Sequence, residues 1–268
     1  MANRDGGARM TSLGCSEQAG VVTLCLQRPD VKNAVDESLM AALDEHIGLL
    51  EQRDDLVAVI LTAEGGESFC SGGDLKWMKG FDTPAKGQAM SRRMQGILHR
   101  LAGLSVPVIG VVNGYAYGGG TEVALACDMR VFEEHAFLCF KQARMGVMTG
   151  WGGGGRLVHL VGYARALEFV TTCRRVEAPE ALTLGLANAV VPRGEGLAEA
   201  HRLADKMRKA SPIAVSTSKR LLRAAGNLDA VAAAQVEAEL FGEVWRSSFH
   251  DEALSAFFEK REPRFRDS

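Results

Sequence analysis

The sequence lacks the patterns that mark common metal sites and nucleic-acid binding. None of its six cysteines forms a CxxC pair, and none of its six histidines stands in an HExxH arrangement. No metal site is therefore expected, and the cysteines are interpreted as free thiols packed as small apolar side chains in a reducing compartment. The formal net charge of −2 gives no basic excess that would favour nucleic acid or an anionic membrane surface as a partner.

Long apolar runs are also missing. The longest stretches, LVAVILTA and VPVIGVV, are far shorter than the ~20 residues that cross a bilayer. Residues 1–13 are polar and glycine-rich and hold no apolar segment of signal-peptide length. We therefore expect a disordered lead over residues 1–13, no membrane partner, and a cytoplasmic protein.

What the sequence contains is an alternation of helices and buried strands. Apolar residues at helical spacing predict a helix between residues 33 and 50, and a helix of mixed polarity is predicted over 84–103. Runs rich in Val and Ile predict strands within 20–29, 56–63 and 106–114. This order predicts an α/β fold with parallel strands. Six helical segments with little strand signal follow residue 157, so we predict a core over residues 14–200 and a helical region over 201–268.

Two glycine loops follow two of the predicted strands. FCSGGDL comes after the strand at 56–63, and NGYAYGGGTE comes after the strand at 106–112. Glycine lets a ligand atom approach the backbone closely, and the first N–H groups of a helix have no internal partner. Gly118–Gly120 alone would fit an ordinary tight turn. Two such loops together predict an oxyanion hole, in which two N–H groups hold one carbonyl oxygen.

Other glycine motifs are absent or incomplete. The P-loop pattern GxxxxGK[ST] does not occur, and the GxSxG nucleophile elbow fails because Phe69 stands two residues before Ser71. GWGGGG at 150–155 fits GxGxxG, but the segment after it lacks the second buried strand of a dinucleotide fold. A nucleotide-binding protein and a serine-triad hydrolase are therefore disfavoured.

Together these segments resemble the crotonase (enoyl-CoA hydratase/isomerase) superfamily over about residues 20–265. The resemblance is carried, in this order and spacing, by QRPDVKNAVDESLM, FCSGGDLKWM, PVIGVVNGYAYGGGTEVALACDMRV, GGRLVHLVGYARALE and AFFEKREPRF. It implies a crotonase spiral of repeated ββα units, with C-terminal helices that assemble a homotrimer or a hexamer. It also implies an acyl-CoA thioester substrate, with coenzyme A present only as part of that substrate and no further cofactor. An acyl-carrier-protein thioester stays open as an alternative.

The resemblance also implies site residues. The backbone N–H groups of Gly73 and Gly119 would hold the thioester oxygen, and Lys32, Ala34 and Lys260 would contact coenzyme A. Lys32 and Lys260 fit solvated surface charges equally well. The other implied substrate-binding positions are Ser71, Gly72, Asp74, Leu75, Trp77, Tyr117, Gly118 and Trp151. By position, the acyl pocket is bordered by Trp77, Met78, Phe81 and Trp151, each of which ordinary packing would also explain.

Hydratases of the superfamily use two glutamates, and this sequence matches only one of them. Glu122 stands at the first position, in the first turn of a predicted helix, where a carboxylate is also favourable for structural reasons. Gln142 stands at the second position, and glutamine cannot exchange a proton near neutral pH. Glu133 and Glu134 are the nearest other acids and are expected to point elsewhere. Simple enoyl-CoA hydration is therefore in doubt.

The run FKQARMGVMTGWGGGGRLV is closer to the ethylmalonyl- and methylmalonyl-CoA decarboxylases of the superfamily, and ELFGEVW also resembles that branch. The sequence therefore favours a lyase that decarboxylates a malonyl-type acyl-CoA, in which Glu122 positions the carboxylate or protonates the enolate and Gln142 hydrogen-bonds in the pocket. A hydratase or double-bond isomerase is the alternative, since isomerisation needs one carboxylate. A third interpretation is a non-catalytic acyl-CoA-binding subunit.

Overall fold

Two sheets organise the chain, for which the computed structural model describes residues 12–245 and 247–266. The larger sheet has the order β1 (Leu13–Gln18), β2 (Val21–Leu26), β3 (Ala58–Ala63), β5 (Val108–Val112), β7 (Met129–Glu133) and β10 (Ala189–Val191). The smaller has the order β4 (Ser68–Cys70), β6 (Tyr115–Tyr117), β8 (Phe137–Cys139) and β9 (Arg175–Glu177). In the larger sheet, β2, β3, β5, β7 and β10 pair in parallel, as predicted, and β1 pairs antiparallel with β2.

The chain repeats a ββα turn, which confirms the predicted spiral. β3 and β4 lead to α2 (Leu75–Met78) and α3 (Pro84–Gly103), and β5 and β6 lead to α4 (Gly119–Ala126). β7 and β8 lead, through a 3₁₀ turn at Lys141–Met145, to α5 (Gly153–Val161). Each turn places its first strand in the larger sheet and its second strand in the smaller one. Because β4 and β6 are neighbours in the smaller sheet, the loops that leave them lie side by side.

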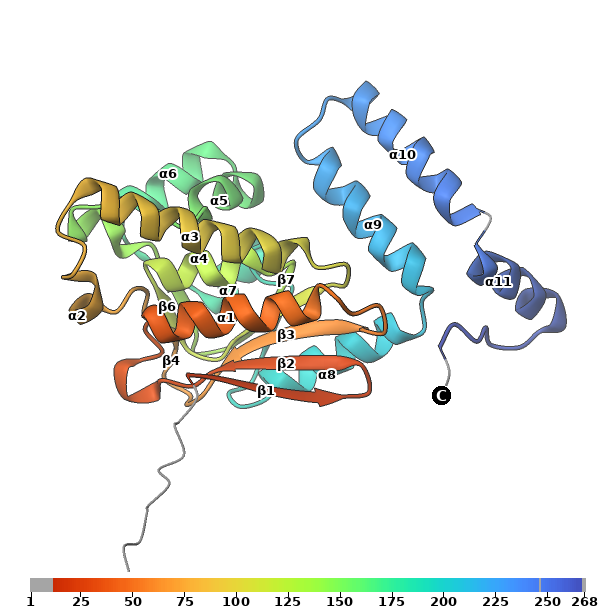
Figure 1. The fold of residues 1–268 in the computed structure, drawn as a ribbon, viewed down its shortest axis with the longest axis horizontal. Coiled ribbons are helices and arrows are strands. Elements are labelled where there is room, and N and C mark those ends of the chain that lie inside the picture. The colour runs from red at the N-terminus through yellow and green to blue at the C-terminus, as the bar shows by residue number, and fades with distance from the viewer. Residues whose placement is uncertain (1–11, 246, 267–268) are drawn as a thin grey trace, which may run out of the picture.

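Helices cover both faces of the larger sheet (Figure 1). α1 (Glu37–Leu50) buries Leu39, Leu43 and Ile47 in the main core, where α3 also packs. On the other face, α8 (Gly196–Arg208) buries Ala200 and Ala204 against a second core cluster that contains residues of β3, β5 and β7. Between these layers, every residue of β3 and β5 is buried and all but Thr62 are apolar, because neither face meets water.

The remaining helices follow the core strands. α6 (Tyr163–Thr172) and α7 (Ala178–Thr183) complete the core, and α9 (Pro212–Ala225), α10 (Ala230–Trp245) and α11 (Ser248–Glu259) form an extension that projects from it (Figure 1). The predicted boundary at residue 200 falls inside α8, which packs on the sheet, so the extension begins after α8. Within the described residues, no helix is long and apolar enough to cross a membrane.

Of the predicted N-terminal lead over residues 1–13, the structure describes only residues 12 and 13. Residues 1–11 lie outside the described part of the chain, and Leu13 already belongs to β1. Leu13 is buried in the main core, so the ordered core reaches slightly further towards the N-terminus than predicted.

Candidate active site

The two glycine loops meet at the ends of β4 and β6. Val35 N–H donates to Gly72 O (2.7 Å) and Asp74 N–H donates to Val35 O (2.8 Å), so Val35 bridges both neighbours of Gly73. In a parallel bridge of this kind, the N–H of the middle residue points to the opposite side. Gly119 begins α4, so its N–H has no partner within the helix. Within the described part of the chain, neither N–H group donates to a protein acceptor.

The contact between the loops requires glycine. Gly72 has φ +98°, and a Cβ there would lie 3.1 Å from the Gly119 nitrogen. A Cβ at Gly119 would overlap the Trp151 ring, and one at Gly120 would overlap the Cys70 carbonyl. Gly118 has φ +52°, which an L side chain rarely adopts. The glycine run therefore lets two backbone N–H groups and the indole of Trp151 converge.

Glu122 lies beneath this point, 1% exposed, and its carboxylate accepts four hydrogen bonds. Oε1 accepts from Gln142 Nε2 (3.2 Å) and from Gly150 N–H (3.1 Å). Oε2 accepts from Trp151 N–H (2.7 Å) and from Gly153 N–H (2.8 Å). A carboxylate offers about four lone-pair sites. The surrounding donors therefore occupy all of them.

Gln142 lies in the 3₁₀ turn after β8 and is also buried. Its amide nitrogen is used by Glu122, whereas its oxygen is buried and accepts no hydrogen bond from the described residues. A Cβ at Gly118 would lie 3.9 Å from Gln142 Cδ, so this side chain borders the second glycine loop. Glu133 instead accepts from Gly196 N–H (3.3 Å) beside α8, and therefore does point elsewhere, as predicted.

Comparison with known proteins shows the family of this chain. A family model described as enoyl-CoA hydratase/isomerase matches residues 16–268. The chain belongs to the enoyl-CoA hydratase/isomerase family. It is 34% identical to a short-chain-enoyl-CoA hydratase of Clostridium acetobutylicum, over 91% of this chain and 94% of that protein. It is 33% identical to an ethylmalonyl-CoA decarboxylase of Xenopus laevis, over 88% and 79%.

A solved enoyl-CoA hydratase from Bacillus anthracis has the same fold. Its TM-score is 0.91 at 31% identity, and the match covers 95% of this chain and 98% of that one. Family membership confirms the predicted superfamily and the prediction of an acyl-CoA-processing lyase at this level.

Like the glycine loops, the aromatic residues implied by the family resemblance converge on one region. Trp77 and Phe81 pack edge to face, with 4.8 Å between ring centroids, and line a cavity of about 240 Å³ between α1, α2 and α3. Met40 and Met90 add to its apolar wall, and its remaining wall is formed by Ala89 and the charged Glu37, Lys86 and Arg93. Trp151 Nε1 donates to Met90 Sδ (3.4 Å). A Cβ at Gly73 would lie 2.5 Å from Met78 Sδ, so Met78 packs against the first loop rather than lining this cavity.

The residues implied for coenzyme A are only partly brought together. Lys32 lies against the first glycine loop, because Ser71 N–H donates to its carbonyl (3.0 Å), and Lys32 Nζ lies 2.5 Å from Glu67 Oε2. This hydrogen bond to Glu67 raises the pKa of Lys32. Ala34 is buried beside the same loop. Lys260 ends α11, at the opposite end of the molecule from α2 (Figure 1), so one chain does not bring it to the site.

The other implied positions hold the loops in place or face solvent. The Asp74 carboxylate accepts from Lys76 N–H (3.0 Å) and Trp77 N–H (3.4 Å) as the N-cap of α2. Leu75 is exposed, and Tyr117 carries Lys141 Nζ over its ring at 4.9 Å.

Sequence reasoning missed the partners of Glu122. The glycines of GWGGGG were interpreted as a weak dinucleotide motif and as part of the family resemblance, yet Gly150 and Gly153 also supply backbone donors to the buried carboxylate. A Cβ at Gly153 would lie 2.5 Å from Glu122 Cγ, which explains that glycine. Met40 and Met90 were also missed, because methionine within an amphipathic helix carries no signal beyond ordinary core packing.

Proposed function

We propose that this protein removes CO2 from a malonyl-type acyl-CoA thioester. The proposal is carried by the four hydrogen bonds that occupy the Glu122 carboxylate. A general base needs a free lone pair within reach of the proton that it takes. Hydration and double-bond isomerisation both ask for such a base, whereas loss of CO2 does not.

The thioester can accept the electron pair of the bond that breaks. The bond between Cα and the carboxylate carbon breaks, CO2 leaves, and the electron pair moves onto the thioester to form an enolate. The N–H groups of Gly73 and Gly119 stabilise the negative oxygen, and the dipole of α4 favours charge at its N-terminus. The thioester itself accepts the electrons, so the reaction needs no cofactor apart from the coenzyme A carried by the substrate.

The enolate must then take up one proton at Cα. Glu122 is a poor donor, since all four of its partners donate to it and therefore match the carboxylate form. Among the described residues, no group donates to Gln142 Oε1, a buried acceptor next to the second glycine loop. We assign it to a water molecule that gives one proton to Cα, and the hydroxide that remains combines with the released CO2 to form bicarbonate. Glu122 then acts as a positioning residue that fixes Gln142 and the backbone of Trp151.

The cavity beside Trp77 suggests a short acyl branch. The cavity measures about 240 Å³, and its apolar part, formed by Met40, Met90, Trp77 and Phe81, suits a small apolar group such as methyl or ethyl. Its remaining wall is charged and is formed by Glu37, Lys86 and Arg93. We assign Lys32 to the coenzyme A end of the substrate, because its carbonyl accepts from Ser71 N–H in the first glycine loop. An acyl-carrier-protein thioester would present the same reacting group.

A hydratase is the second candidate, because the chain is 34% identical to a short-chain-enoyl-CoA hydratase over 91% of its length. Hydration requires Glu122 to lose one of its four hydrogen bonds when the substrate binds, because a general base needs a free lone pair. An isomerase has the same requirement.

One incubation separates these functions. The purified protein is given methylmalonyl-, ethylmalonyl- and crotonyl-CoA together, and the products are identified by mass spectrometry. We expect loss of CO2 from a malonyl thioester while crotonyl-CoA stays unchanged. Addition of water to crotonyl-CoA alone would make the protein a hydratase, and binding without turnover would leave only an acyl-CoA-binding role.

A glycine pair tests the oxyanion hole in the same assay. Gly119→Ala drives a Cβ into the Trp151 ring, so we expect decarboxylation to fall by about 10²-fold or more, the usual effect of losing one oxyanion donor. Gly87→Ala is the matched control, because its Cβ meets no atom within 4 Å on α3. Alanine there should leave activity intact and raise stability by about 0.5–1 kcal/mol. Equal activities of the two variants would contradict the role of Gly119.

A further inference from the structure

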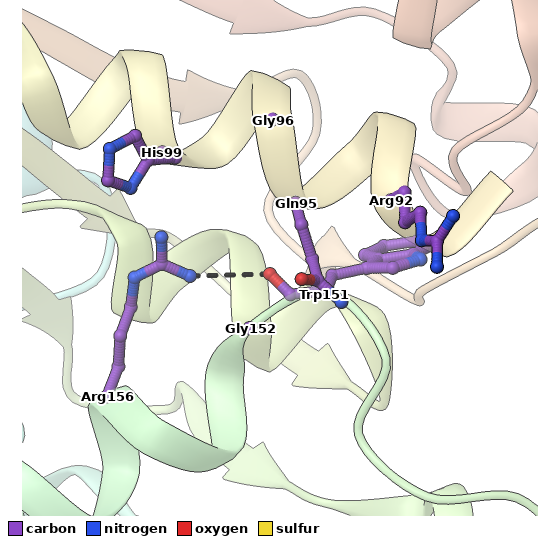
Figure 2. A pocket seen from close by; sticks show the side chains of 7 residues that line it. All are labelled: Arg92, Gln95, Gly96, His99, Trp151, Gly152 and Arg156. Atoms are coloured by element: carbon purple, nitrogen blue, oxygen red, sulfur yellow. Dashed lines mark hydrogen bonds between the residues drawn. The ribbon is translucent and has the colours of Figure 1, made fainter. Parts of the chain in front are cut away.

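A second and larger cavity lies between α3 and α5. It measures about 420 Å³, and Trp151 and Gly152 form one end of it. Arg92, Gln95 and His99 project from α3, and Arg156 rises from α5 opposite them (Figure 2). The proposed reaction uses none of these four side chains.

The charge of this cavity is of one sign. Two arginines and a histidine line it, and no acidic side chain does. Within the described residues, neither Arg92 nor Arg156 forms an ion pair, whereas the neighbouring Arg93 and Arg100 of α3 are paired with carboxylates. Among the described residues, these two arginines are therefore without a directly paired carboxylate.

Among these groups, Arg156 is the best suited to bind an anion. It is half-buried, and its Nη1 donates only to the Trp151 carbonyl (3.3 Å). Burial lowers the pKa of Arg156, Glu122 nearby opposes that shift, and the positive charge of Arg223 adds to it. A half-buried guanidinium is costly unless an anion compensates it, and a guanidinium matches a carboxylate in geometry.

We propose that this cavity binds a carboxylate at Arg156, beneath His99, and that Arg92 adds positive charge from the far side of Trp151 (Figure 2). Gln95 is held at one side by its bond to Gly150 O (2.8 Å), and His99 extends the wall on the other side. Gly152, at φ +88°, leaves room for the guanidinium, because a Cβ there would lie 2.9 Å from Arg156 Nη1.

Trp151 connects this cavity to the reacting centre. The indole lies against Gly119, and the same residue lines the cavity. The carboxylate therefore has two sources. It is either the far end of an acyl chain that passes the indole, which would make the substrate a thioester of a dicarboxylic acid and rests on the proposed function, or a free carboxylate.

Two binding measurements distinguish the sources. Calorimetric titration with free glutarate, at constant ionic strength, reports a free carboxylate. The difference in affinity between glutaryl-CoA and pentanoyl-CoA, whose acyl chains are similar in length, reports binding of a carboxylate at the far end of the acyl chain. Each is measured on the intact protein, on Arg92→Gln and Arg156→Gln, and on Arg202→Gln as the control. Arg202 lies on α8, paired with Glu199, and loses the same charge away from the cavity.

We expect Arg156→Gln to weaken binding of the carboxylate ligand by about ten-fold or more, the usual loss for one charge-assisted contact. Arg92→Gln, which removes positive charge without a direct contact, should weaken it by a few-fold (on the order of 2–5), and Arg202→Gln should leave it unchanged. If the variants change only the ratio of the affinities for glutaryl-CoA and pentanoyl-CoA, the site binds the far end of the substrate. If they change only the affinity for glutarate, the site binds a free carboxylate.

Equal binding by the intact protein and Arg92→Gln, in both titrations, overturns the inference. Arg92 is exposed, so this variant carries the test if Arg156→Gln does not fold. Because binding is measured without turnover, a failure of malonyl-CoA decarboxylation leaves the glutarate result intact, and the two failures are distinguishable.

Discussion

Among single residues, Glu122 and Gln142 decide the chemistry that the site supports. Glu122 stands where the family resemblance places an acid, but its surroundings make it an acceptor for the backbone of residues 150–153. Gln142 keeps one free acceptor in the same place. The pair therefore combines a fixed carboxylate with a group that can hold water.

Glu122→Gln tests this positioning role. The variant replaces one oxygen by an NH2 group, which then faces two donors, and leaves buried donors without an acceptor. Each unsatisfied group costs about 1–3 kcal/mol, so we expect the free energy of unfolding to fall by about 2–4 kcal/mol. Decarboxylation should fall at least ten-fold as Trp151 loses its anchor.

Denaturant unfolding and the mass-spectrometric assay measure both effects. Glu134→Gln is the control, since Glu134 is an exposed glutamate. Full activity and wild-type stability in Glu122→Gln would show that the carboxylate neither positions the loop nor takes part in the reaction.

At the scale of single residues, the sequence predicted which side chains come together better than it predicted their hydrogen-bond partners. The motif resemblance implied Gly73, Gly119, Glu122 and Gln142, and the structure brings all four to one place. It could not reveal that residues 150–153 fold back onto Glu122, because that contact joins residues 28 to 31 positions apart in the chain. Local pattern carries no information on such pairings.

Among the elements, α2 fixes the first glycine loop. Asp74 follows Gly73 and caps α2, and its carboxylate also pairs with Arg28 (3.2 Å). Arg28 in turn pairs with Asp36 (2.7 Å), the N-cap of α1, and donates to the Ala34 carbonyl. One guanidinium thus ties the starts of two helices to the oxyanion loop.

Asp74→Ala should therefore weaken both stability and turnover. Loss of the N-cap costs about 1–2 kcal/mol, and release of Gly73 should lower kcat more than it raises KM. Thr83→Ala removes the cap of α3 at similar cost but lies away from the loop, so its kcat should stay near that of the intact protein. Equal kcat values in the two variants would show that the N-cap of α2 does not hold the oxyanion hole in place.

The contribution of Asp74 also has a pH window. Burial alone would raise the pKa of Asp74, but the N–H groups of Trp77 and Lys76 and the Arg28 guanidinium lower it overall. A carboxyl group whose pKa is lowered on folding stabilises the fold above its unfolded pKa of about 3.9. The stability difference between the intact protein and Asp74→Ala should therefore shrink as pH falls below about 4, which thermal unfolding across pH would record.

The long elements were predictable and the short ones were not. α3 runs over Pro84–Gly103, the range that helical pattern predicted, and β3 and β5 lie within the predicted apolar runs. β4, β6, β8, β9 and β10 have three residues each, too few for alternation to register. β1 was missed because its outward residues are polar and it pairs as the edge of a hairpin.

At the scale of the whole molecule, the helical extension is tied to the core mainly through α9. Lys219 Nζ bonds Asp128 Oδ2 (2.6 Å) and the Val106 carbonyl (2.8 Å), next to the start of β5. Beyond this tie, α9, α10 and α11 leave many large apolar side chains in solvent, including Leu222, Phe241, Trp245, Phe257 and Phe258. Apolar surface of this extent is typical of a protein interface.

We therefore expect the protein to assemble through the extension as a homotrimer or a hexamer. Native mass spectrometry should give three or six times the chain mass of 28.8 kDa. Phe258 is 78% exposed, so Phe258→Asp should leave the fold intact and shift the assembly towards monomer. Gln52→Asp, at an exposed position after α1, adds the same charge outside the extension and should not change the mass.

Assembly also bears on the substrate, because α11, which Lys260 caps, lies at the opposite end of the chain's fold from α2, which follows the first glycine loop (Figure 1). A contact between Lys260 and coenzyme A therefore requires a second copy of the chain. On this basis Phe258→Asp should raise KM for the acyl-CoA substrate several-fold while kcat changes less, since Gly73, Gly119 and Glu122 all come from one chain. Lys260→Ala should raise KM to a similar extent without changing the mass of the assembly. A monomeric Phe258→Asp with unchanged KM would mean that each chain binds coenzyme A with its own residues, Lys32 among them.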